Sequence, residues 1–307
     1  MNGAGEQRMR FMLQFPDTHG TDADMLDCGS VAEIAVAAER AGFDGLAFTE
    51  HPAPGARWLA AGGHQSLDPF VALGGAATVT TRIRLLTYLT VIPYRNPLLL
   101  AKSAATVDRL SNGRFILGAG AGYLKGEFAA LGVDFEERNA LIDEALDVLP
   151  KHWSGEPFDF VGKHFSARSV QARPLPAQSP IPIWLGGNSK RTLQRVAERC
   201  QGWMPLVGSD ALFKTTRTPS PGGPEEIAAR IAELKHAAAQ RDETLDFAIA
   251  YSDPALAKPR ADVERHRSNL AQLAEIGATW TIVSRPAASR EETLDFIAAF
   301  AETYVGR

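Results

Sequence analysis

Residues 83–118 read IRLLTYLTVIPYRNPLLLAKSAATVDRLSNGRFILG, and this stretch has two mainly apolar runs on either side of one helical segment. The runs at 83–93 and 114–118 are short, as expected of parallel strands that are buried on both faces. Between them, Asn96 followed by Pro97 indicates the start of a helix, and Gly113 indicates its end. The stretch therefore predicts one strand–helix–strand unit.

The same alternation extends over most of the chain, because strand-like runs are followed by helical patterns. The strand-like runs are expected at 9–15, 43–50, 83–93, 114–118, from Ile181 onward, 203–207, 245–251 and 278–284. The last helical pattern begins at Ser289, which has the spacing of a capping box with Glu292. The chain is thus expected to contain eight strand–helix pairs.

Three interruptions of this rhythm are expected. Pro150 should kink or end the helix that begins near residue 136. Residues 158–180 are punctuated by proline and resemble a hairpin-rich insertion before the fifth strand. Residues 208–223 are expected to form a loop, since Ser, Thr, Pro and Gly are dense near their end.

Eight strand–helix pairs fit two architectures, an eight-fold (β/α) barrel and an open doubly wound parallel sheet. The count of eight and the length of 307 residues favour the α/β class with a TIM (β/α)8 barrel and the insertion before strand five. No interior linker suggests a second domain. Residues 9–307 are therefore expected to form a single domain, and residues 1–8 a flexible tail.

The composition excludes several classes of protein. The net charge of −4 does not indicate the excess of positive charge expected of a protein that binds nucleic acid or an anionic membrane. No apolar run approaches the ~18 residues of a membrane span, and the polar first ten residues do not resemble a secretory signal. With only two cysteines, Cys28 and Cys200, no disulfide framework or metal knuckle is expected, which fits a cytoplasmic protein.

Catalytic side chains of such barrels lie at the carboxyl ends of the strands, so the residues after each strand are the candidates. His51 follows the second strand, and imidazole can gain or lose a proton near neutral pH. Glu50 could tune it, although neighbouring strand residues usually point to opposite sides. From the residues alone, a catalytic and a structural role for His51 remain equally open.

The turn after the fifth strand contains Gly186, Gly187, Asn188 and Ser189 and opens a helix. Glycines before a helix N-terminus present free N–H groups and the positive end of the helix dipole, which together can hold a phosphate. An ordinary strand–helix turn capped by Asn or Ser fits the same residues. Both interpretations remain open at this point.

The run RFILGAGAGY (114–123) starts with the apolar residues of a strand, and its residues 118–122 are all Gly or Ala. Gly and Ala let a backbone come close to a neighbour, so something should approach this run. Its GxGxG spacing is not the dinucleotide fingerprint, and no helix starts directly after it, so we reject a nicotinamide site there. The chain also lacks GxSxG, HExxH and a carboxylate pair suited to glycoside hydrolysis.

Three stretches resemble the bacterial luciferase-like monooxygenase superfamily, and most closely its branch of oxidoreductases that use the deazaflavin coenzyme F420. They are AGFDGLAFTEHPAP (41–54), the long stretch 81–138 and PIPIWLGGNSKRTLQRVAERCQGWMPL (180–206). The middle stretch is the most diagnostic, because its order of strand, RNP turn, helix, SNGR, strand, glycines and EFAALG is hard to obtain otherwise. The resemblance runs from about Met9 to Val283.

The resemblance implies a TIM-type barrel with a flavin or deazaflavin at the carboxyl ends of its strands. The implied cofactor-binding residues are Tyr88, Leu89, Gly120, Ala121, Gly122, Tyr123, Gly186, Gly187, Asn188 and Ser189. Within this set, the last four match the phosphate turn of the family, and the Tyr88–Leu89 peptide bond matches a cis bond behind the cofactor ring. His51 matches a catalytic acid or base beside the hydride-transfer centre.

The chain departs from some deazaflavin dehydrogenases at two of these positions. Tyr123 stands where they have Glu, and Glu50 stands where they have Asp. A tyrosine can donate a hydrogen bond but is a poor proton acceptor at neutral pH. The departures argue against a specific match to the sugar-phosphate or alcohol dehydrogenases of that branch.

Four functions follow as hypotheses. The first is an F420-dependent oxidoreductase that transfers a hydride between the deazaflavin and a small organic substrate, with His51 handling one proton. The second is an FMN-dependent monooxygenase that uses reduced flavin and oxygen. A metal-assisted hydrolase with Glu50 and His51, and a cofactor-binding protein without catalysis, are the third and fourth. The resemblance also implies a homodimer. Candidate substrate walls are Trp58, His64, Tyr94, Phe128 and the insertion near 158–165.

Overall fold

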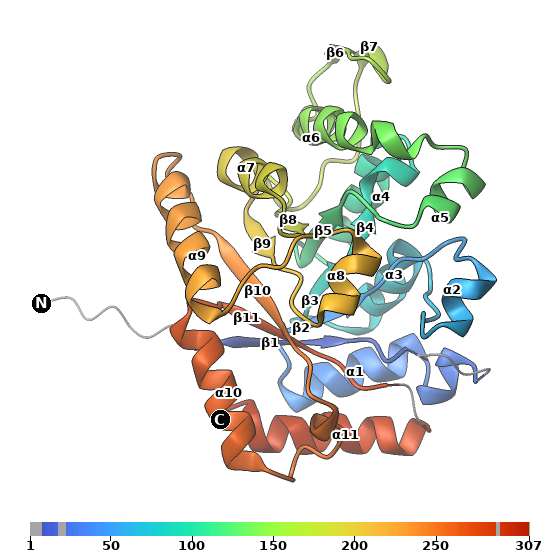
Figure 1. Cartoon of the computed structure of the whole chain (residues 1–307). Coiled ribbons are helices and arrows are strands. Elements are labelled where there is room, and N and C mark those ends of the chain that lie inside the picture. Colours follow the sequence, from blue (N-terminus) through green and yellow to red (C-terminus); the bar gives the residue numbers. More distant parts are fainter. Residues whose placement is uncertain (1–7, 18–22, 287–288, 307) are drawn as a thin grey trace, which may run out of the picture.

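The computed structural model describes residues 8–17, 23–286 and 289–306. Within this part of the chain, eight parallel strands close into a barrel, because the order β3-β2-β1-β11-β10-β9-β8-β5 is completed by pairing between β3 and β5 (Figure 1). The barrel strands are β1 (Arg10–Gln14), β2 (Gly45–Phe48), β3 (Arg84–Thr87), β5 (Phe115–Gly120), β8 (Ile183–Gly186), β9 (Gly202–Met204), β10 (Asp246–Tyr251) and β11 (Trp280–Val283). The expected TIM barrel is confirmed.

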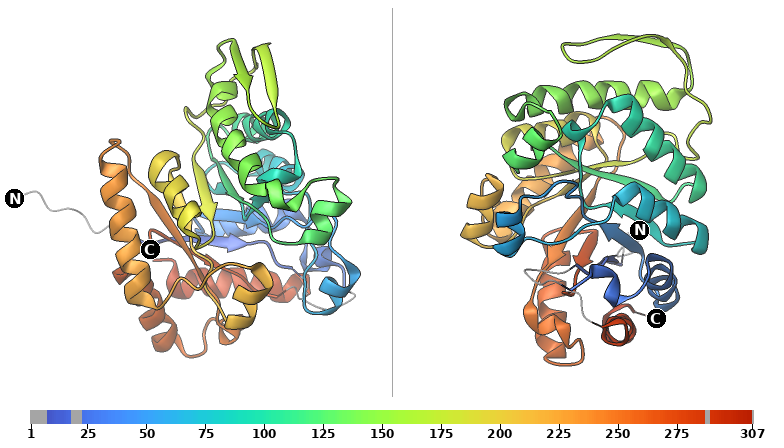
Figure 2. Two further views of the ribbon diagram at one scale, coloured as in Figure 1. Left: turned by 45° about the horizontal axis from the view of Figure 1, so that its top comes forward. Right: turned by 90° about the vertical axis from the view of Figure 1, so that its right-hand side faces the viewer.

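Helices surround these strands in all views (Figures 1 and 2). The longer ones are α1 (Val31–Ala41), α3 (Pro69–Val79), α4 (Pro97–Leu110), α6 (Arg138–Ser154), α7 (Lys190–Arg199), α9 (Pro224–Ala239), α10 (Val263–Glu275) and α11 (Arg290–Tyr304). Their starts follow the expected signals, since the Asn96 side chain caps α4 and Ser289 forms its capping box with Glu292. Tertiary packing then buries one face of each helix.

The predicted third strand is divided into three pieces. β3 ends at Thr87, the two-residue β4 (Thr90–Val91) pairs with β5, and a 3-10 turn follows at Ile92–Tyr94. The Tyr88–Leu89 peptide bond between β3 and β4 is cis, as the family resemblance implied. The barrel wall therefore has an irregular segment beside the end of β5.

Pro150 does not end α6, so of the two outcomes expected from sequence, a kink or an end, the second is wrong. The helix continues to Ser154 and stops at Gly155, which has φ of +72°. The last turn is anchored after the proline, because Trp153 is buried and its Nε1 donates to the carbonyl oxygen of Ala101 at 3.0 Å. This packing outweighs the hydrogen bond that a proline removes from a helix.

The expected loop at 208–223 contains a short helix, α8 (Asp210–Thr216). Its start is capped by Ser209, whose Oγ accepts from the N–H of Leu212 at 3.3 Å. The turn-forming residues 218–223 mask this signal in the sequence. The expectation of a loop was therefore wrong for residues 210–216.

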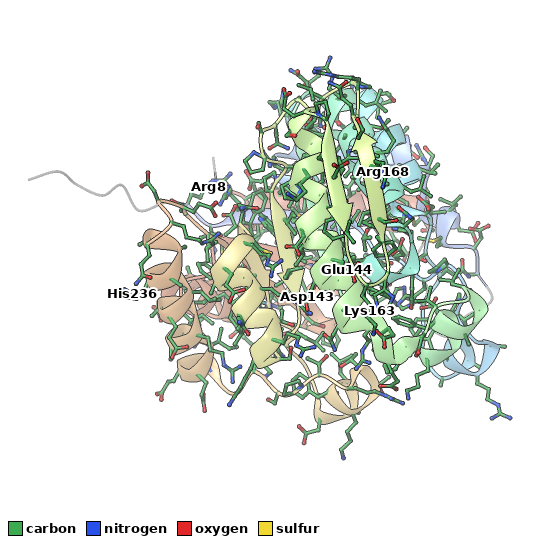
Figure 3. All side chains as sticks on the ribbon, turned by 90° about the horizontal axis from the view of Figure 1, so that it is seen from above. Arg8, Asp143, Glu144, Lys163, Arg168 and His236 are labelled. Atoms are coloured by element: carbon green, nitrogen blue, oxygen red, sulfur yellow. The ribbon has the colours of Figure 1, made fainter. Side chains whose placement is uncertain are left out.

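The insertion before the fifth barrel strand is an antiparallel hairpin of β6 (Phe158–Val161) and β7 (Ser166–Val170). The hairpin lies over α6. Figure 3 labels Glu144 on the helix and Lys163 and Arg168 on the hairpin. The Glu144 carboxylate accepts from the N–H groups of Lys163, His164 and Phe165 at 2.9–3.1 Å. These bonds hold the hairpin turn against the helix.

The apolar core has two layers. The larger one lies between the strands and the surrounding helices, and the smaller one fills the barrel interior with Met12, Leu86, Ile116, Trp184 and Trp280 among others. Gly202 leaves room for the Trp184 indole, since a Cβ there would lie 2.3 Å from its ring. The interior is thus a packed core, as in other barrels of this type.

The structure describes only the last residue of the expected tail at 1–8. Residues 1–7 of the expected tail lie outside the described residues, whereas Arg8 forms an ion pair with Asp44 at 2.8 Å. The division into a tail at 1–8 and a single domain over 9–307 stays a prediction.

Candidate active site

His51 lies just after β2, at the carboxyl end of the barrel, and only about 10% of its side chain is exposed. Its backbone N–H donates to Ser66 Oγ at 2.7 Å, and Ser66 Oγ donates back to the His51 carbonyl at 3.2 Å. Its Nδ1 lies 3.1 Å from Glu127 Oε2. Main chain and ring are therefore both fixed by hydrogen bonds.

Glu127 comes from α5 (Lys125–Ala130), the short helix after β5, and its side chain is 1% exposed. Besides His51, its carboxylate accepts from the Tyr94 hydroxyl at 2.8 Å and from the Ala53 N–H at 3.2 Å. Burial alone would raise the pKa of Glu127, but hydrogen bonds from His51, Tyr94 and Ala53, and the interaction with His51, hold it below its usual value. Glu127 is therefore an ionised carboxylate at neutral pH that accepts three hydrogen bonds.

The ionised carboxylate assigns the tautomer of His51. A carboxylate can only accept, so Nδ1 carries the hydrogen that faces Glu127. In the neutral ring, Nε2 then holds the lone pair and is the proton acceptor. A buried Glu–His pair of this kind is suited to general acid–base chemistry.

Aromatic side chains surround the His51 ring. Trp58 on α2 (Ala56–Ala60) lies 4.4 Å away between ring centroids, His64 lies 5.0 Å away and Tyr123 lies 6.1 Å away. Burial and the negative charge of Glu127 raise the pKa of Tyr123 to about 12, so its hydroxyl stays protonated at neutral pH. The His51 ring is thus surrounded by aromatic rings that also carry N–H or O–H groups.

Glu50 is not brought to His51. Its carboxylate forms an ion pair with Arg95 and accepts from the N–H of Val91 at 2.7 Å. Burial raises the pKa of Glu50, and Arg95 opposes that rise. Glu50 thus fixes β4 and the segment that follows it. Since β2 ends at Phe48, Glu50 and His51 both lie in the loop after the strand, and their different partners set their directions.

The Gly and Ala run at the end of β5 is approached by the chain's own segment after β3. A Cβ at Gly118 would lie 1.9 Å from the Thr87 carbonyl oxygen, and one at Gly120 would lie 2.8 Å from the Leu89 side chain. On the neighbouring strand, a Cβ at Gly186 would lie 2.3 Å from Leu89. These glycines therefore make room for residues 87–89 within the barrel wall.

Residues 121–123 leave the strand beside His51. Ala121, Gly122 and Tyr123 are half-buried, and Gly122 has φ of +75°, which favours glycine. A Cβ at Gly122 would also lie 2.6 Å from Val91. Tyr88 is part-buried in the barrel interior, and burial raises its pKa to about 12.

The turn after β8 has the expected form at Gly187 and Ser189. Gly187 has φ of +111°, and the Ser189 Oγ accepts from the N–H of Thr192 at 3.1 Å to cap α7. Such a cap leaves the first N–H groups of the helix, those of Lys190 and Arg191, for water or a ligand. The backbone of the turn can therefore hold an anion.

Asn188 has a different role from the one expected. Its Nδ2 donates to the carbonyls of Leu206 and Pro219 at 2.8 and 2.9 Å, and its Oδ1 accepts from the Leu206 N–H at 3.0 Å. Both amide hydrogens are thus used to fix the loop after β9. The side chain of Asn188 is not a donor for a phosphate, although its backbone remains in the turn.

A cavity of about 410 Å³ lies at the opposite end of the barrel, among residues at strand starts such as Arg10, Arg84 and Asp246. Arg10 forms an ion pair with Asp246 and stacks on Trp280 at 4.2 Å. This end of a TIM barrel serves stability. The His51 end remains the candidate active site.

Among the described residues, no group of three or more His, Cys, Asp or Glu side chains is arranged to hold a metal ion. Nor does any helix within them combine the length and apolarity needed to cross a membrane.

Sequence reasoning missed Glu127, which is the partner of His51. The signal was available, because Glu127 stands in the EFAALG motif beside the buried Phe128, and a carboxylate buried there needs a partner. Which partner it finds depends on how helix α5 approaches the loop after β2, since His51 and Glu127 are 76 residues apart in the chain.

A family model described as luciferase-like monooxygenase matches residues 9–303. An uncharacterized protein of Mycobacterium tuberculosis is 30% identical over 187 residues, which are 61% of this chain and 59% of that relative. The F420-dependent glucose-6-phosphate dehydrogenase of Gordonia bronchialis is 29% identical over 244 residues, which are 76% of this chain and 68% of the dehydrogenase. The chain thus spans about three-fifths of the first relative's length.

Solved structures show the same fold over nearly the whole chain. The monooxygenase RslO1 of Streptomyces bottropensis has a TM-score of 0.76 at 21% identity, and the match covers 97% of this chain and 99% of the monooxygenase. The oxygenating constituent of 3,6-diketocamphane monooxygenase of Pseudomonas putida, in complex with FMN, has a TM-score of 0.69 at 16% identity, with 97% and 98% covered. At these identities the likeness shows the fold alone.

Proposed function

This chain belongs to the luciferase-like monooxygenase family, and from that premise we propose that it is an oxidoreductase that works with coenzyme F420. Its reaction would transfer a hydride between the deazaflavin and a small organic substrate. The observation that carries the proposal is the His51–Glu127 pair, with 3.1 Å between Nδ1 and Oε2, at the catalytic end of the barrel. The similarity to an F420-dependent dehydrogenase of Gordonia bronchialis supports the choice of cofactor.

The residues at this end of the barrel fit a cofactor with a phosphate and a flat ring. Gly187, with φ of +111°, and the capped start of α7 leave backbone N–H groups for the phosphate. Leu89, whose side chain packs against Gly120 and Gly186, forms an apolar wall at this end of the barrel. The half-buried residues 121–123 continue this wall toward His51. We therefore assign these segments to cofactor binding.

When bound, the deazaflavin supplies the hydride donor or acceptor. The chain's own residues handle the proton. His51 takes a proton from a substrate hydroxyl at Nε2, or returns it, while Nδ1–H stays on Glu127. The negative charge of Glu127 stabilises the imidazolium that forms. Trp58 and Tyr123 shield the ring from water, which strengthens this interaction.

A cofactor titration tests the proposal. Fluorescence titrations of the protein with F420 and with FMN should show tighter binding of F420, and F420 should protect the protein better against heating. Equal or reversed affinities would contradict it. The partner we propose is a small-molecule substrate, and the protein is expected to act as a homodimer.

An FMN-dependent monooxygenase is the second candidate. The family model that matches residues 9–303 is described as luciferase-like monooxygenase, and this description favours it. In that case, reduced FMN would be retained and the substrate would gain one oxygen atom from O₂, which mass spectrometry with ¹⁸O₂ detects. Hydride exchange with F420 and no ¹⁸O incorporation would exclude this candidate.

A further inference from the structure

The cavity at the amino-terminal end of the barrel is lined by the first residues of four strands. β1 begins with Arg10, β3 with Arg84, β10 with Asp246 and β11 with Trp280, and all four line the cavity. Its volume of about 410 Å³ lies within the range of small-molecule sites, which is roughly 300–1,000 Å³. The cavity is therefore large enough for a small ligand.

Three lining residues have buried hydrogen-bond donors without a partner. Arg10 Nε, Arg84 Nε and Trp280 Nε1 are buried, and none of them meets an acceptor within the part of the chain that the structure describes. Each is an N–H group that can only donate. Buried polar groups are nearly always paired, and an exception calls for an explanation such as a bound ion or water. Three donors around one cavity favour a ligand that offers several acceptor oxygens.

Two of the three carboxylates that line the cavity are occupied by other partners. Asp44 forms an ion pair with Arg8 at 2.8 Å and accepts from the Phe11 N–H at 2.9 Å. Glu39 accepts from the N–H groups of residues 81–83 at 2.6–3.1 Å. Asp246 therefore remains as the carboxylate that can balance the guanidinium groups at the strand starts.

Asp246 balances one of these two guanidinium groups. It forms an ion pair with Arg10 and accepts from the Thr279 hydroxyl at 2.9 Å. Arg84 has no ion pair with a carboxylate of the described ranges, and its Nη2 donates to the uncharged Gln178 amide at 3.2 Å. Burial lowers the pKa of Arg84, Asp246 opposes this effect, and the positive charge of Arg10 adds to it. Arg84 thus brings to the cavity a positive charge that no carboxylate neutralises by direct contact.

We propose that this cavity is a second ligand site, which binds a phosphate group, either free or carried by a small molecule. The phosphate oxygens accept from Arg84 and Arg10, since a guanidinium suits such acceptors in both charge and geometry. Phe43, Ile83 and Ile116 also line the cavity and can contact an uncharged part of the ligand. A ligand that binds only the closed barrel stabilises the folded protein. The inference does not rest on the proposed oxidoreductase function, because the candidate active site lies at the other end.

The first test is isothermal titration calorimetry of the whole chain with inorganic phosphate and with phenyl phosphate, at constant ionic strength in chloride. We expect both to bind, and Arg84→Met to weaken binding about tenfold, because a charged hydrogen bond is lost. Arg168→Met is the matched control, since Arg168 is exposed on β7 and its loss removes the same charge. Tighter binding of phenyl phosphate would identify an organic phosphate as the ligand, and equal binding would identify the free anion.

Gly187→Val separates this site from the turn after β8. Phosphate binding at the cavity should persist in Gly187→Val, because that turn lies at the opposite end of the barrel. Binding that is unchanged in Arg84→Met, reduced equally in Arg168→Met, or abolished by Gly187→Val would overturn the proposal.

The second test uses the original protein and so does not depend on the folding of a variant. Phenylglyoxal modifies accessible guanidinium groups, and peptide mass spectrometry follows the reaction at each arginine. Phosphate should slow the modification of Arg10 and Arg84 several-fold and leave that of Arg168 unchanged. Equal rates at Arg10 and Arg84 with and without phosphate would refute the site.

Discussion

Replacing Glu127 by Gln tests the partner that fixes His51. The carboxylate accepts three hydrogen bonds, from His51 Nδ1, the Tyr94 hydroxyl and the Ala53 N–H. A carboxamide has the same shape but only one acceptor oxygen, so its NH₂ group must face at least one donor. One buried donor left without a partner costs about 1–3 kcal/mol, and a hydrogen bond to a charged group contributes about 1.5–3 kcal/mol.

The expected result at pH 7 is a loss of ~2–3 kcal/mol in the free energy of unfolding, from lost charged hydrogen bonds and one unsatisfied donor. Turnover should fall roughly 10²-fold or more, because the imidazolium loses its counter-charge and its tautomer is no longer enforced. Urea unfolding followed by circular dichroism, and steady-state kinetics with the bound cofactor, measure the two effects. Glu136→Gln is the matched control, because Glu136 is 71% exposed and pairs with Lys125 on the surface.

The loss of unfolding free energy caused by Glu127→Gln should also depend on pH. The pKa of Glu127 is lowered in the folded protein, so its stabilising effect is complete above the ordinary glutamate pKa of about 4.3 and is lost as the pH falls through the folded value. The difference in the free energy of unfolding between the original protein and Glu127→Gln should therefore become smaller only below about pH 4.3. If Glu127→Gln matched Glu136→Gln in stability and turnover at pH 7, the assignment of the His51 partner would be refuted.

Three further predictions concern the cofactor site and the assembly. His51→Gln should bind the cofactor with unchanged affinity in a fluorescence titration but turn over ~10²–10⁴-fold more slowly; a weaker binding with normal turnover would contradict its role. Gly187→Val should weaken cofactor binding at least tenfold, about 1.4 kcal/mol, because φ of +111° strains a side chain in the phosphate turn. Its control is Gly74→Val, a site with free space around the added Cβ, and equal losses in both would attribute the effect to folding. The exposed apolar side chains Val71 and Leu99 on α3 and α4 are expected to lie in a homodimer interface, so light scattering should give a dimer mass that Leu99→Glu reduces to a monomer.

The barrel could be predicted from sequence because its signals are local. Asn96 and Pro97 start α4 whatever surrounds them, and the apolar run at 114–118 is buried in any parallel sheet. His51 could be located by the same logic, since residues that follow a strand reach the catalytic end of a barrel. The family resemblance added the cis bond at Tyr88–Leu89, which no local pattern indicates.

Several features depended on contacts between distant segments. α6 passes through Pro150 because Trp153 is anchored on α4, and no property of the proline itself indicates that. Asn188 looks like a cap or a phosphate ligand in the sequence, but the loops at 206 and 219 take both of its amide hydrogens. Local propensity fails where a tertiary partner supplies a competing hydrogen bond or packing surface.

The sequence by itself determined the elements and the end of the barrel at which chemistry can occur, because capping, periodicity and strand ends are set by near neighbours. Only the tertiary structure decided which charges pair there. Glu50 is next to His51 in the chain but forms an ion pair with Arg95, whereas Glu127 is 76 residues away and holds the imidazole. Glu50 is held by Arg95 and the β4 backbone, so closure of the barrel, and not sequence proximity, brings a carboxylate to the catalytic ring.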